Sequence, residues 1–206
     1  MIDAIIFDFD GTLYDSFDEI SLAFSKATEK VLGKSVNLDR TDIGPKLEEI
    51  FFKKTGLSNS KYKTFELEFR EIYDNTYSGT GQLYEGVSGL LSTGKEKSIM
   101  QFVISNKPDP VLKRIINKHN IYGAFTEIIG SNSASSTNKK QELTKLLDRH
   151  FIGSNIMVVG DTIEDYDMAV INNCQFIHAA YGYGKVEVYN IKKAHSVVQL
   201  KDYLFS

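Results

Sequence analysis

Residues 4–12 of the chain read Ala-Ile-Ile-Phe-Asp-Phe-Asp-Gly-Thr. The run from residue 4 to residue 9 is almost continuously apolar, which is typical of a strand buried on both faces of a parallel sheet. Asp8 and Asp10 close the run two positions apart, so in a regular strand both side chains would point the same way. Gly11 permits an immediate tight turn. This stretch predicts a central strand that ends in paired carboxylates.

Four further apolar runs share the character of the first and lead into polar or glycine-containing stretches. They lie at 102–104, 127–129, 156–159 and 175–179. Segments with apolar residues at helical spacing separate them, at 111–116, 143–147 and 166–171. Alternation of strand and helix predicts an α/β domain built on a Rossmann-like, doubly wound parallel sheet.

Residues 15–82 interrupt this alternation. Their apolar residues recur at helical spacing in three segments, 20–31, 47–51 and 65–73, and no run resembles a strand. The alternation resumes near Leu83. We therefore expect a helical cap domain over 15–82, inserted after the first strand of a core domain formed by 1–14 and 83–206.

Composition limits the kinds of partner. With 206 residues and 42% hydrophobic composition, the chain can form one substantial domain with a smaller insert. A net charge of −3 gives no global positive field for nucleic acid or an anionic membrane. The single cysteine, Cys174, the absence of signal-peptide features and the shortness of the apolar runs favour a soluble, cytoplasmic protein. A small molecule is the expected partner, and a monomer or weak homodimer the expected state.

Polar side chains follow three of the predicted strands at the point where each ends. In a parallel sheet these carboxyl ends meet at one edge, where the loops converge on a crevice. We expect one site to gather the polar residues at these ends, with a lysine at the start of a nearby helix. The strand-end residues are Asp8, Asp10, Ser105, Asp161 and Asp165.

The pair Asp8 and Asp10 suggests a cation and an acid–base role. Neighbouring carboxylates repel one another unless a cation or a shared proton lies between them. Magnesium prefers such oxygen ligands and also neutralises phosphate. Asp8 could then attack phosphorus in line, while Asp10, kept partly protonated, gives its proton to the leaving alkoxide. For the pair alone, simple turn capping is the competing interpretation.

Asp161 and Asp165 lie four residues apart, which places them on one face of a helix's first turn. Asp161 is the better placed for direct magnesium contact, and Asp165 for orienting metal-bound water or Lys139. Either could instead be an ordinary helix cap. Together with the first pair, they make a carboxylate-rich cation site the favoured interpretation.

The remaining candidates would hold phosphate. The hydroxyl of Ser105 and nearby backbone amides could bind a phosphoryl oxygen, although serine before Asn-Lys-Pro is also a common turn. Lys139 or Lys140 could place an ammonium against the phosphate, although most lysines are solvated surface groups. Lys107 is a secondary phosphate candidate.

The whole pattern resembles the haloacid dehalogenase superfamily, specifically its phosphoglycolate-phosphatase-like members with a helical cap. The resemblance covers nearly the whole chain and rests on four motifs. These are residues 8–16 (DFDGTLYDS), 103–107 (VISNK), 137–143 (TNKKQEL) and 160–165 (GDTIED). The first motif is the most specific of the four.

The resemblance implies specific roles for the carboxylates. Asp8 would be the nucleophile that forms an aspartyl-phosphate, and Asp10 the acid and base. The implied cofactor is Mg²⁺, with Asp8, Asp161 and the backbone carbonyl of Asp10 as its ligands. Gly11, Thr12 and Asp165 would support the site.

The resemblance also implies a phosphate site formed by Ser105, Asn106 and a lysine. Register against Leu143 favours Lys139 over Lys140. Many relatives have Lys-Pro at this motif, whereas this chain has two consecutive lysines.

Among the reactions of this scaffold, hydrolysis of a small phosphorylated metabolite is the expected one. Asp10 argues against dehalogenation, which has no use for a second acid. A sugar-phosphate mutase is the enzymatic alternative, but such enzymes use a histidine near the start of the cap, and residues 15–82 contain no histidine. A catalytically silent phosphate-binding scaffold is the alternative outside the enzymes.

Overall fold

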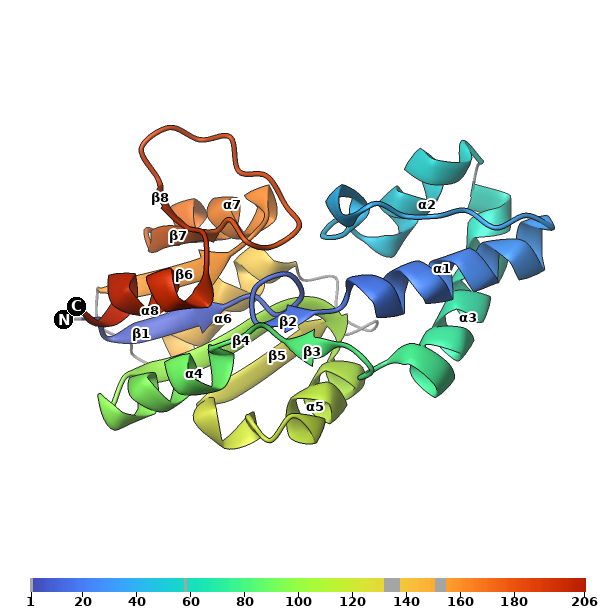
Figure 1. The fold of residues 1–206 in the computed structure, drawn as a ribbon. Helices are drawn as coiled ribbons and strands as arrows, with labels where there is room; N and C mark the ends of the chain where they lie inside the picture. The colour runs from blue at the N-terminus through green and yellow to red at the C-terminus, as the bar shows by residue number, and fades with distance from the viewer. Residues whose placement is uncertain (1, 58, 132–137, 151–154) are drawn as a thin grey trace. The chain divides into compact units, whose positions relative to one another are not determined.

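The computed structural model describes residues 2–57, 59–131, 138–150 and 155–206. The chain divides into two compact units (Figure 1). Unit 1 comprises Met1–Asp15 and Leu83–Ser206, and unit 2 comprises Ser16–Gln82. None of the helices in the described residues combines the length and apolar character needed to cross a membrane.

Unit 1 is built on a six-stranded parallel sheet in the order β5-β4-β1-β6-β7-β8 (Figure 1). The chain builds outward from β1 in one direction and then in the other, so the strand order reverses at β1, where such sheets form their crevice. The strands are β1 (Ala4–Phe7), β4 (Met100–Pro108), β5 (Glu127–Ser131), β6 (Ile156–Gly160), β7 (Gln175–Ala179) and β8 (Lys192–Ala194). A separate two-stranded pair joins β2 (Tyr14–Asp15) to β3 (Gln82–Leu83).

Helices cover both faces of this sheet. Helices α6 (Lys139–His150) and α7 (Ile163–Ile171) contact each other and the central strands. Helices α4 (Val87–Glu96) and α8 (Val197–Phe205) contact each other and pack on β4, β7 and β8. Alternate side chains of β1, Ala4 and Ile6, join the core under α6 and α7. Their neighbours Ile5 and Phe7 are also fully buried, which explains why the strand is continuously apolar. The doubly wound α/β fold expected from the sequence is confirmed.

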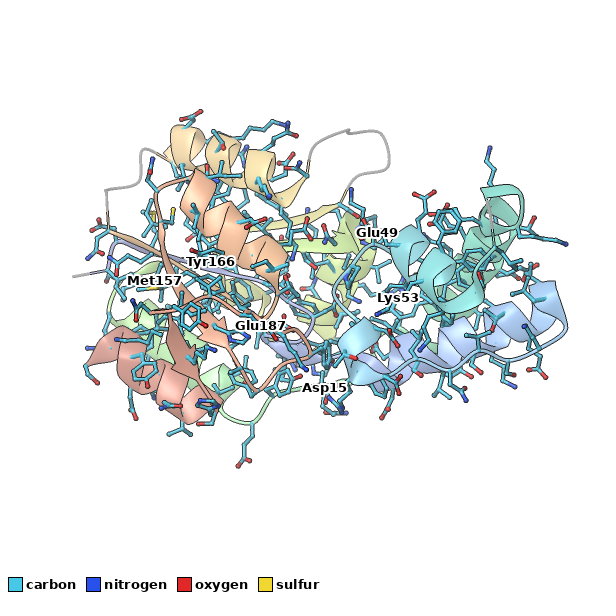
Figure 2. All side chains as sticks on the ribbon, turned by 90° about the horizontal axis from the view of Figure 1, so that it is seen from above. Asp15, Glu49, Lys53, Met157, Tyr166 and Glu187 are labelled. Atoms are coloured by element: carbon cyan, nitrogen blue, oxygen red, sulfur yellow. The ribbon has the colours of Figure 1, made fainter. Side chains whose placement is uncertain are left out.

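The helices of unit 1 are α4 (Val87–Glu96), α5 (Asp109–Lys118), η3 (Tyr122–Ala124), α6 (Lys139–His150), α7 (Ile163–Ile171) and α8 (Val197–Phe205). Tyr166 of α7, which is labelled in Figure 2, packs edge-on against Phe176 of β7, with ring centroids 5.5 Å apart. Such aromatic contacts fasten the helix that follows β6 to the sheet.

Unit 2 is helical, and its core is aromatic. Phe51 and Phe65 stack with centroids 4.5 Å apart, and Phe24 meets Phe65 edge-on at 4.9 Å. The buried Glu19 accepts hydrogen bonds from the Tyr73 hydroxyl (2.9 Å) and from two backbone amides of the returning chain. The elements are α1 (Phe17–Leu32), η1 (Arg40–Asp42), α2 (Leu47–Thr55), α3 (Asn59–Ile72) and η2 (Tyr73–Tyr77).

The fourth strand differs from the sequence expectation. The apolar run predicted a strand ending at Ile104, but β4 continues to Pro108, with its register against β5 shifted between these two residues. The polar segment 105–107 therefore lies on an irregular stretch of strand, where the ladder is interrupted. Such irregularities re-aim side chains next to functional sites.

Candidate active site

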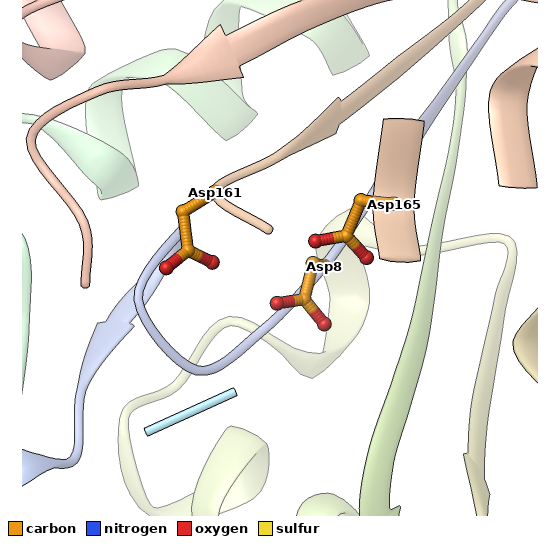
Figure 3. Close-up of side chains that lie close together, drawn as sticks. All are labelled: Asp8, Asp161 and Asp165. Carbon is orange, nitrogen blue, oxygen red and sulfur yellow. The ribbon is translucent and has the colours of Figure 1, made fainter. Parts of the chain in front are cut away.

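Side chains from separate segments converge at the carboxyl edge of the sheet. Asp8 follows β1 and Asp161 follows β6, while Asp165 lies in the first turn of α7. The carboxylates of these three residues lie close together (Figure 3), with one oxygen of each within 4.8 Å of the others. All three are buried. The carboxylates that the sequence placed at strand ends are thus brought together.

Lys139, the first residue of α6, inserts its ammonium between two of these carboxylates. Its Nζ lies 2.6 Å from Asp8 Oδ1 and 2.9 Å from Asp165 Oδ1, and its side chain is 5% exposed. Lys140 instead lies 3.1 Å from Asp167 at the surface. Of the two consecutive lysines, only Lys139 contacts the carboxylate cluster.

Asp165 is fully engaged by the protein itself. In addition to Lys139 on Oδ1, its Oδ2 accepts hydrogen bonds from the backbone amide and the hydroxyl of Thr162, at 3.1 and 2.6 Å. Thr162 in turn caps α7 with that side chain. Proximity alone would make Asp165 a third metal ligand. Both of its oxygens accept hydrogen bonds, however, so Asp165 instead supports Lys139 and the turn at Thr162.

Electrostatics distinguish Asp8 and Asp161 from ordinary carboxylates. Burial and the charge of Asp165 raise the pKa of Asp8 well above its usual value, against the opposing effect of Lys139. Burial and Asp165 likewise raise the pKa of Asp161 to about 6. The pKa of Lys139 is raised because the attraction of Asp165 and Asp8 outweighs its desolvation. Three buried carboxylates share one ammonium, so the cluster carries excess negative charge.

This donor set suits a divalent cation. Hard cations such as magnesium take carboxylate and carbonyl oxygens. A cation bound by Asp8 and Asp161 would offset the charge that raises their pKa values. In the described part of the chain, the hydrogen bonds of Asp8 fall on Oδ1, which leaves Oδ2 for a ligand. The residues present therefore fit the group that the sequence suggested.

The loop after β1 is tightly folded around this cluster. Gly11 has a left-handed backbone (φ +82°), and a Cβ at this position would overlap the Asp161 carboxylate. The Thr12 hydroxyl donates to Asp161 Oδ1 at 3.3 Å. Gly11 and Thr12 thus contact the cluster directly, at the positions where the sequence indicated supporting residues.

Asp10 has a different environment from Asp8. Its carboxylate is 18% exposed, and Oδ1 lies 3.2 Å from the ammonium of Lys107, which is itself buried. The contact is an ion pair without hydrogen-bond geometry, since that oxygen has no hydrogen-bond partner within the described residues. Lys107, a secondary phosphate candidate from the sequence, is placed against Asp10.

The phosphate candidates share one cleft of about 380 Å³ within unit 1. Ser105, Asn106 and Lys139 are all among its lining residues. The Ser105 hydroxyl accepts the Lys107 amide at 3.1 Å. Asn106 donates through Nδ2 to Glu164 at 2.8 Å, a contact that links the second and fourth motifs and that the sequence did not suggest.

Another contact missing from the sequence expectations involves residues 181–184, Tyr-Gly-Tyr-Gly. The backbone amides of Tyr183 and Gly184 donate to Asp161 Oδ2 at 2.9 and 3.0 Å. The only sequence signal for this contact is the pair of glycines after the strand, which indicates a turn or a close backbone approach. Glycines alone do not reveal that the loop approaches Asp161.

Comparison with known proteins places these observations in a family. A model of the family described as haloacid dehalogenase-like hydrolase matches residues 5–179. The phosphoglycolate phosphatase of Vibrio vulnificus (strain YJ016) is 28% identical, over 98% of this chain and 95% of that protein. The tyrosine-protein kinase PtkA of Mycobacterium tuberculosis (strain ATCC 25618 / H37Rv) is 26% identical, over 89% of this chain and 64% of that protein.

Solved structures share the fold over the full length. A hydrolase of the haloacid dehalogenase-like family from Streptococcus pneumoniae superposes with a TM-score of 0.88 at 26% identity, covering 98% of each chain. A protein from Clostridium acetobutylicum, described as a predicted phosphatase, has a TM-score of 0.88 at 23% identity, covering 99% of this chain and 98% of its own.

Proposed function

Because the chain belongs to the haloacid dehalogenase-like hydrolases, we propose that it is a magnesium-dependent phosphatase that hydrolyses a small phosphorylated metabolite through an aspartyl-phosphate on Asp8. The observation that supports this most is the contact of Lys139 with Asp8, 2.6 Å apart in a buried cluster that still carries excess negative charge. A nucleophile and a countercharge are thus held together beside a cleft. Phosphoglycolate phosphatases among the relatives point to the same class of reaction.

The proposed first step is an in-line attack of Asp8 on phosphorus. The Asp8 carboxylate forms the new P–O bond as the bond from phosphorus to the substrate oxygen breaks, and Asp10 gives that oxygen its proton. Lys139 favours the ionised form of Asp8, which the attack requires. In the second step Asp10 accepts a proton from water, the water attacks the aspartyl-phosphate, and phosphate leaves while Asp8 is regenerated.

Magnesium would be held by the side chains of Asp8 and Asp161 and, by analogy with the family, by the backbone carbonyl of Asp10. When bound, it would offset the negative charge shared by the phosphate and the carboxylates. Asp165 would keep Lys139 in place, and Gly11 and Thr12 would keep Asp161 in place. The roles of Asp165, Gly11 and Thr12 use contacts described above.

Ser105, Asn106 and Lys139 are the proposed phosphate ligands. Their shared cleft supports this assignment, as does the irregular stretch of β4 that presents the first two. Asn106 would bind phosphate with its backbone amide, while its side-chain amide is held by one hydrogen bond to Glu164. Ser105 would offer its hydroxyl hydrogen, because its oxygen accepts the Lys107 amide.

Unit 2 is the proposed cap, which would close over the substrate and exclude water. Its residues would then select the leaving group. We also propose a cytoplasmic location and a monomer or weak homodimer. The mutase alternative is disfavoured because no histidine occurs in residues 16–82 to redirect the phosphoryl group.

Phosphate release from para-nitrophenyl phosphate and from a panel of phosphorylated metabolites, with and without Mg²⁺, tests the proposal. Wild type should turn over only with Mg²⁺, and Asp8→Asn should lower kcat by about a thousandfold or more while keeping its fold. Asp42→Asn, in unit 2, is the matched control and should retain activity. Turnover by Asp8→Asn at the wild-type rate, or no turnover by the wild type across the panel, would contradict the proposal.

A further inference from the structure

The segment 181–184 after β7 does more than close a loop. Its backbone amides at Tyr183 and Gly184 both donate to one oxygen of Asp161, Oδ2, at 2.9 and 3.0 Å. A carboxylate is planar, so fixing one oxygen with two donors also fixes the direction of the other. The remaining oxygen, Oδ1, accepts from Thr12 at 3.3 Å. Asp161 therefore owes its orientation to two loops that lie far apart in the sequence.

The same segment is anchored to the loop after β1 by its two phenols. The Tyr183 hydroxyl donates to Asp15 Oδ1 at 2.7 Å, and the Tyr181 hydroxyl donates to the Thr12 carbonyl at 2.8 Å. Tyr183 is 4% exposed. Burial raises the pKa of Tyr181, so this phenol stays a neutral donor.

Close backbone approach makes these contacts possible. A Cβ at Gly182 would overlap the Gly11 carbonyl, and one at Gly184 would overlap the Asp161 carbonyl. Gly182 lets the segment lie directly on the loop after β1, and Gly184 lets it lie directly on Asp161. Between them, Tyr183 contributes its amide to Asp161 and its hydroxyl to Asp15.

Building on the proposed function, we propose that Tyr183 is a positioning residue for the metal-binding carboxylate of Asp161. Its phenol, bound to Asp15, holds its own amide against Asp161 Oδ2, so that Oδ1 stays directed at the cation. Asp15 is also the last residue of unit 1 before the chain enters unit 2. Tyr183 thus contacts both Asp161, the proposed metal ligand, and Asp15, the last residue of β2.

Tyr183→Phe removes only the hydroxyl and is the decisive variant. Loss of one buried hydrogen bond corresponds to a change of about 2- to 12-fold, so the Kd for Mg²⁺ should rise by about that factor. Activity at limiting Mg²⁺ should fall, and kcat should recover at saturating Mg²⁺. Tyr189→Phe is the control, since Tyr189 lies in the same connection and is 95% exposed; its Mg²⁺ affinity should match that of the wild type.

Calorimetric titration with MgCl₂ in the absence of substrate keeps this test separate from catalysis. Thermal melts of the metal-free proteins check that the variants fold, and Tyr183→Leu supplies a second variant that loses the whole phenol. An unchanged Mg²⁺ Kd in both variants would overturn the positioning role, even if both were less stable. Wild-type protein that binds Mg²⁺ but hydrolyses nothing would refute the phosphatase proposal alone, whereas a wild type that binds no Mg²⁺ would overturn both.

Discussion

Two clusters of acidic and basic side chains, one in each unit, differ in how their charges balance. The cluster of unit 1 gathers three buried carboxylates around one ammonium, that of Lys139. In unit 2, the carboxylate of Asp42 accepts from Lys53 at 3.0 Å and from Lys54 at 2.8 Å. Lys54 also lies 3.5 Å from the exposed Asp39.

The pKa values move in opposite directions in the two clusters. Burial would raise the pKa of Asp42, but hydrogen bonds from Lys54, the Asp39 amide and Lys53 lower it to about 2. The pKa values of Asp8 and Asp161 are raised instead. Lys53, labelled in Figure 2, is 67% exposed, whereas every charge of the unit 1 cluster is buried. The carboxylates of the unit 2 cluster are balanced by lysines, whereas those of the unit 1 cluster are not, and this difference supports the proposed cation site in unit 1.

The largest predicted difference between the clusters follows from removing one lysine from each. In metal-free protein at neutral pH, Lys139→Met should lower the free energy of unfolding by about 3–5 kcal/mol, because two buried carboxylates lose their partner. Lys54→Met should cost less than that, about 1 kcal/mol, because the exposed Lys53 still pairs with Asp42. Urea unfolding of both variants measures this. Equal losses would show that the two clusters play the same structural part.

A second prediction concerns magnesium. Mg²⁺ at about a hundred times its Kd should stabilise the wild type by about 2.7 kcal/mol, because it binds only the folded protein. Asp42→Asn should gain the same increment, and Asp161→Asn should gain little. Thermal melts with and without MgCl₂, at constant ionic strength, provide the measurement. An undiminished increment in Asp161→Asn would place the cation elsewhere.

The sequence was sufficient for five of the six strands of the sheet and for the residues that end three of them. Asp8 and Asp161 were predictable because buried parallel strands are continuously apolar, and a carboxylate closing such a run is conspicuous. Topology then brings these ends together without any knowledge of side-chain positions. The resemblance to the haloacid dehalogenase superfamily, read from the same motifs, is confirmed by the family match.

Other contacts between segments far apart in the chain were not predictable. Lys107 reads as a residue of a turn, yet its ammonium lies against Asp10 because β4 continues through an irregular stretch to Pro108. The contact of Tyr183 with Asp161 has no chemical signature in the sequence, since it is made by a backbone amide that every residue except proline possesses. Short elements such as β8 were missed as well, because three residues are too few to show a period.

A third prediction removes one carboxylate charge from the unit 1 cluster. In metal-free protein at neutral pH, Asp161→Asn should raise the free energy of unfolding by about 1–2 kcal/mol, because it relieves the cost of ionising a group whose pKa is about 6 in the fold. Asparagine keeps an oxygen for the amides of Tyr183 and Gly184. The gain should vanish below about pH 4, where Asp161 is protonated in both states. A loss of stability at neutral pH would contradict the excess negative charge assigned to this cluster.

The smallest predicted effect is the acid response of Asp42. Its folded pKa of about 2 lies below the unfolded value near 3.8, so its ion pairs stabilise the fold above about pH 4. This contribution is lost as the pH falls toward 2, because protons then bind the unfolded state first. Asp42→Asn should therefore be less stable than the wild type by less than about 1 kcal/mol at neutral pH, given the exposure of Lys53. Urea unfolding of both proteins between neutral pH and pH 3 should show that gap narrowing below pH 4. A gap that stayed constant across the range would mean that Asp42 stabilises unit 2 through hydrogen bonds that asparagine cannot replace, and its charge balance would then not distinguish it from the cluster of unit 1.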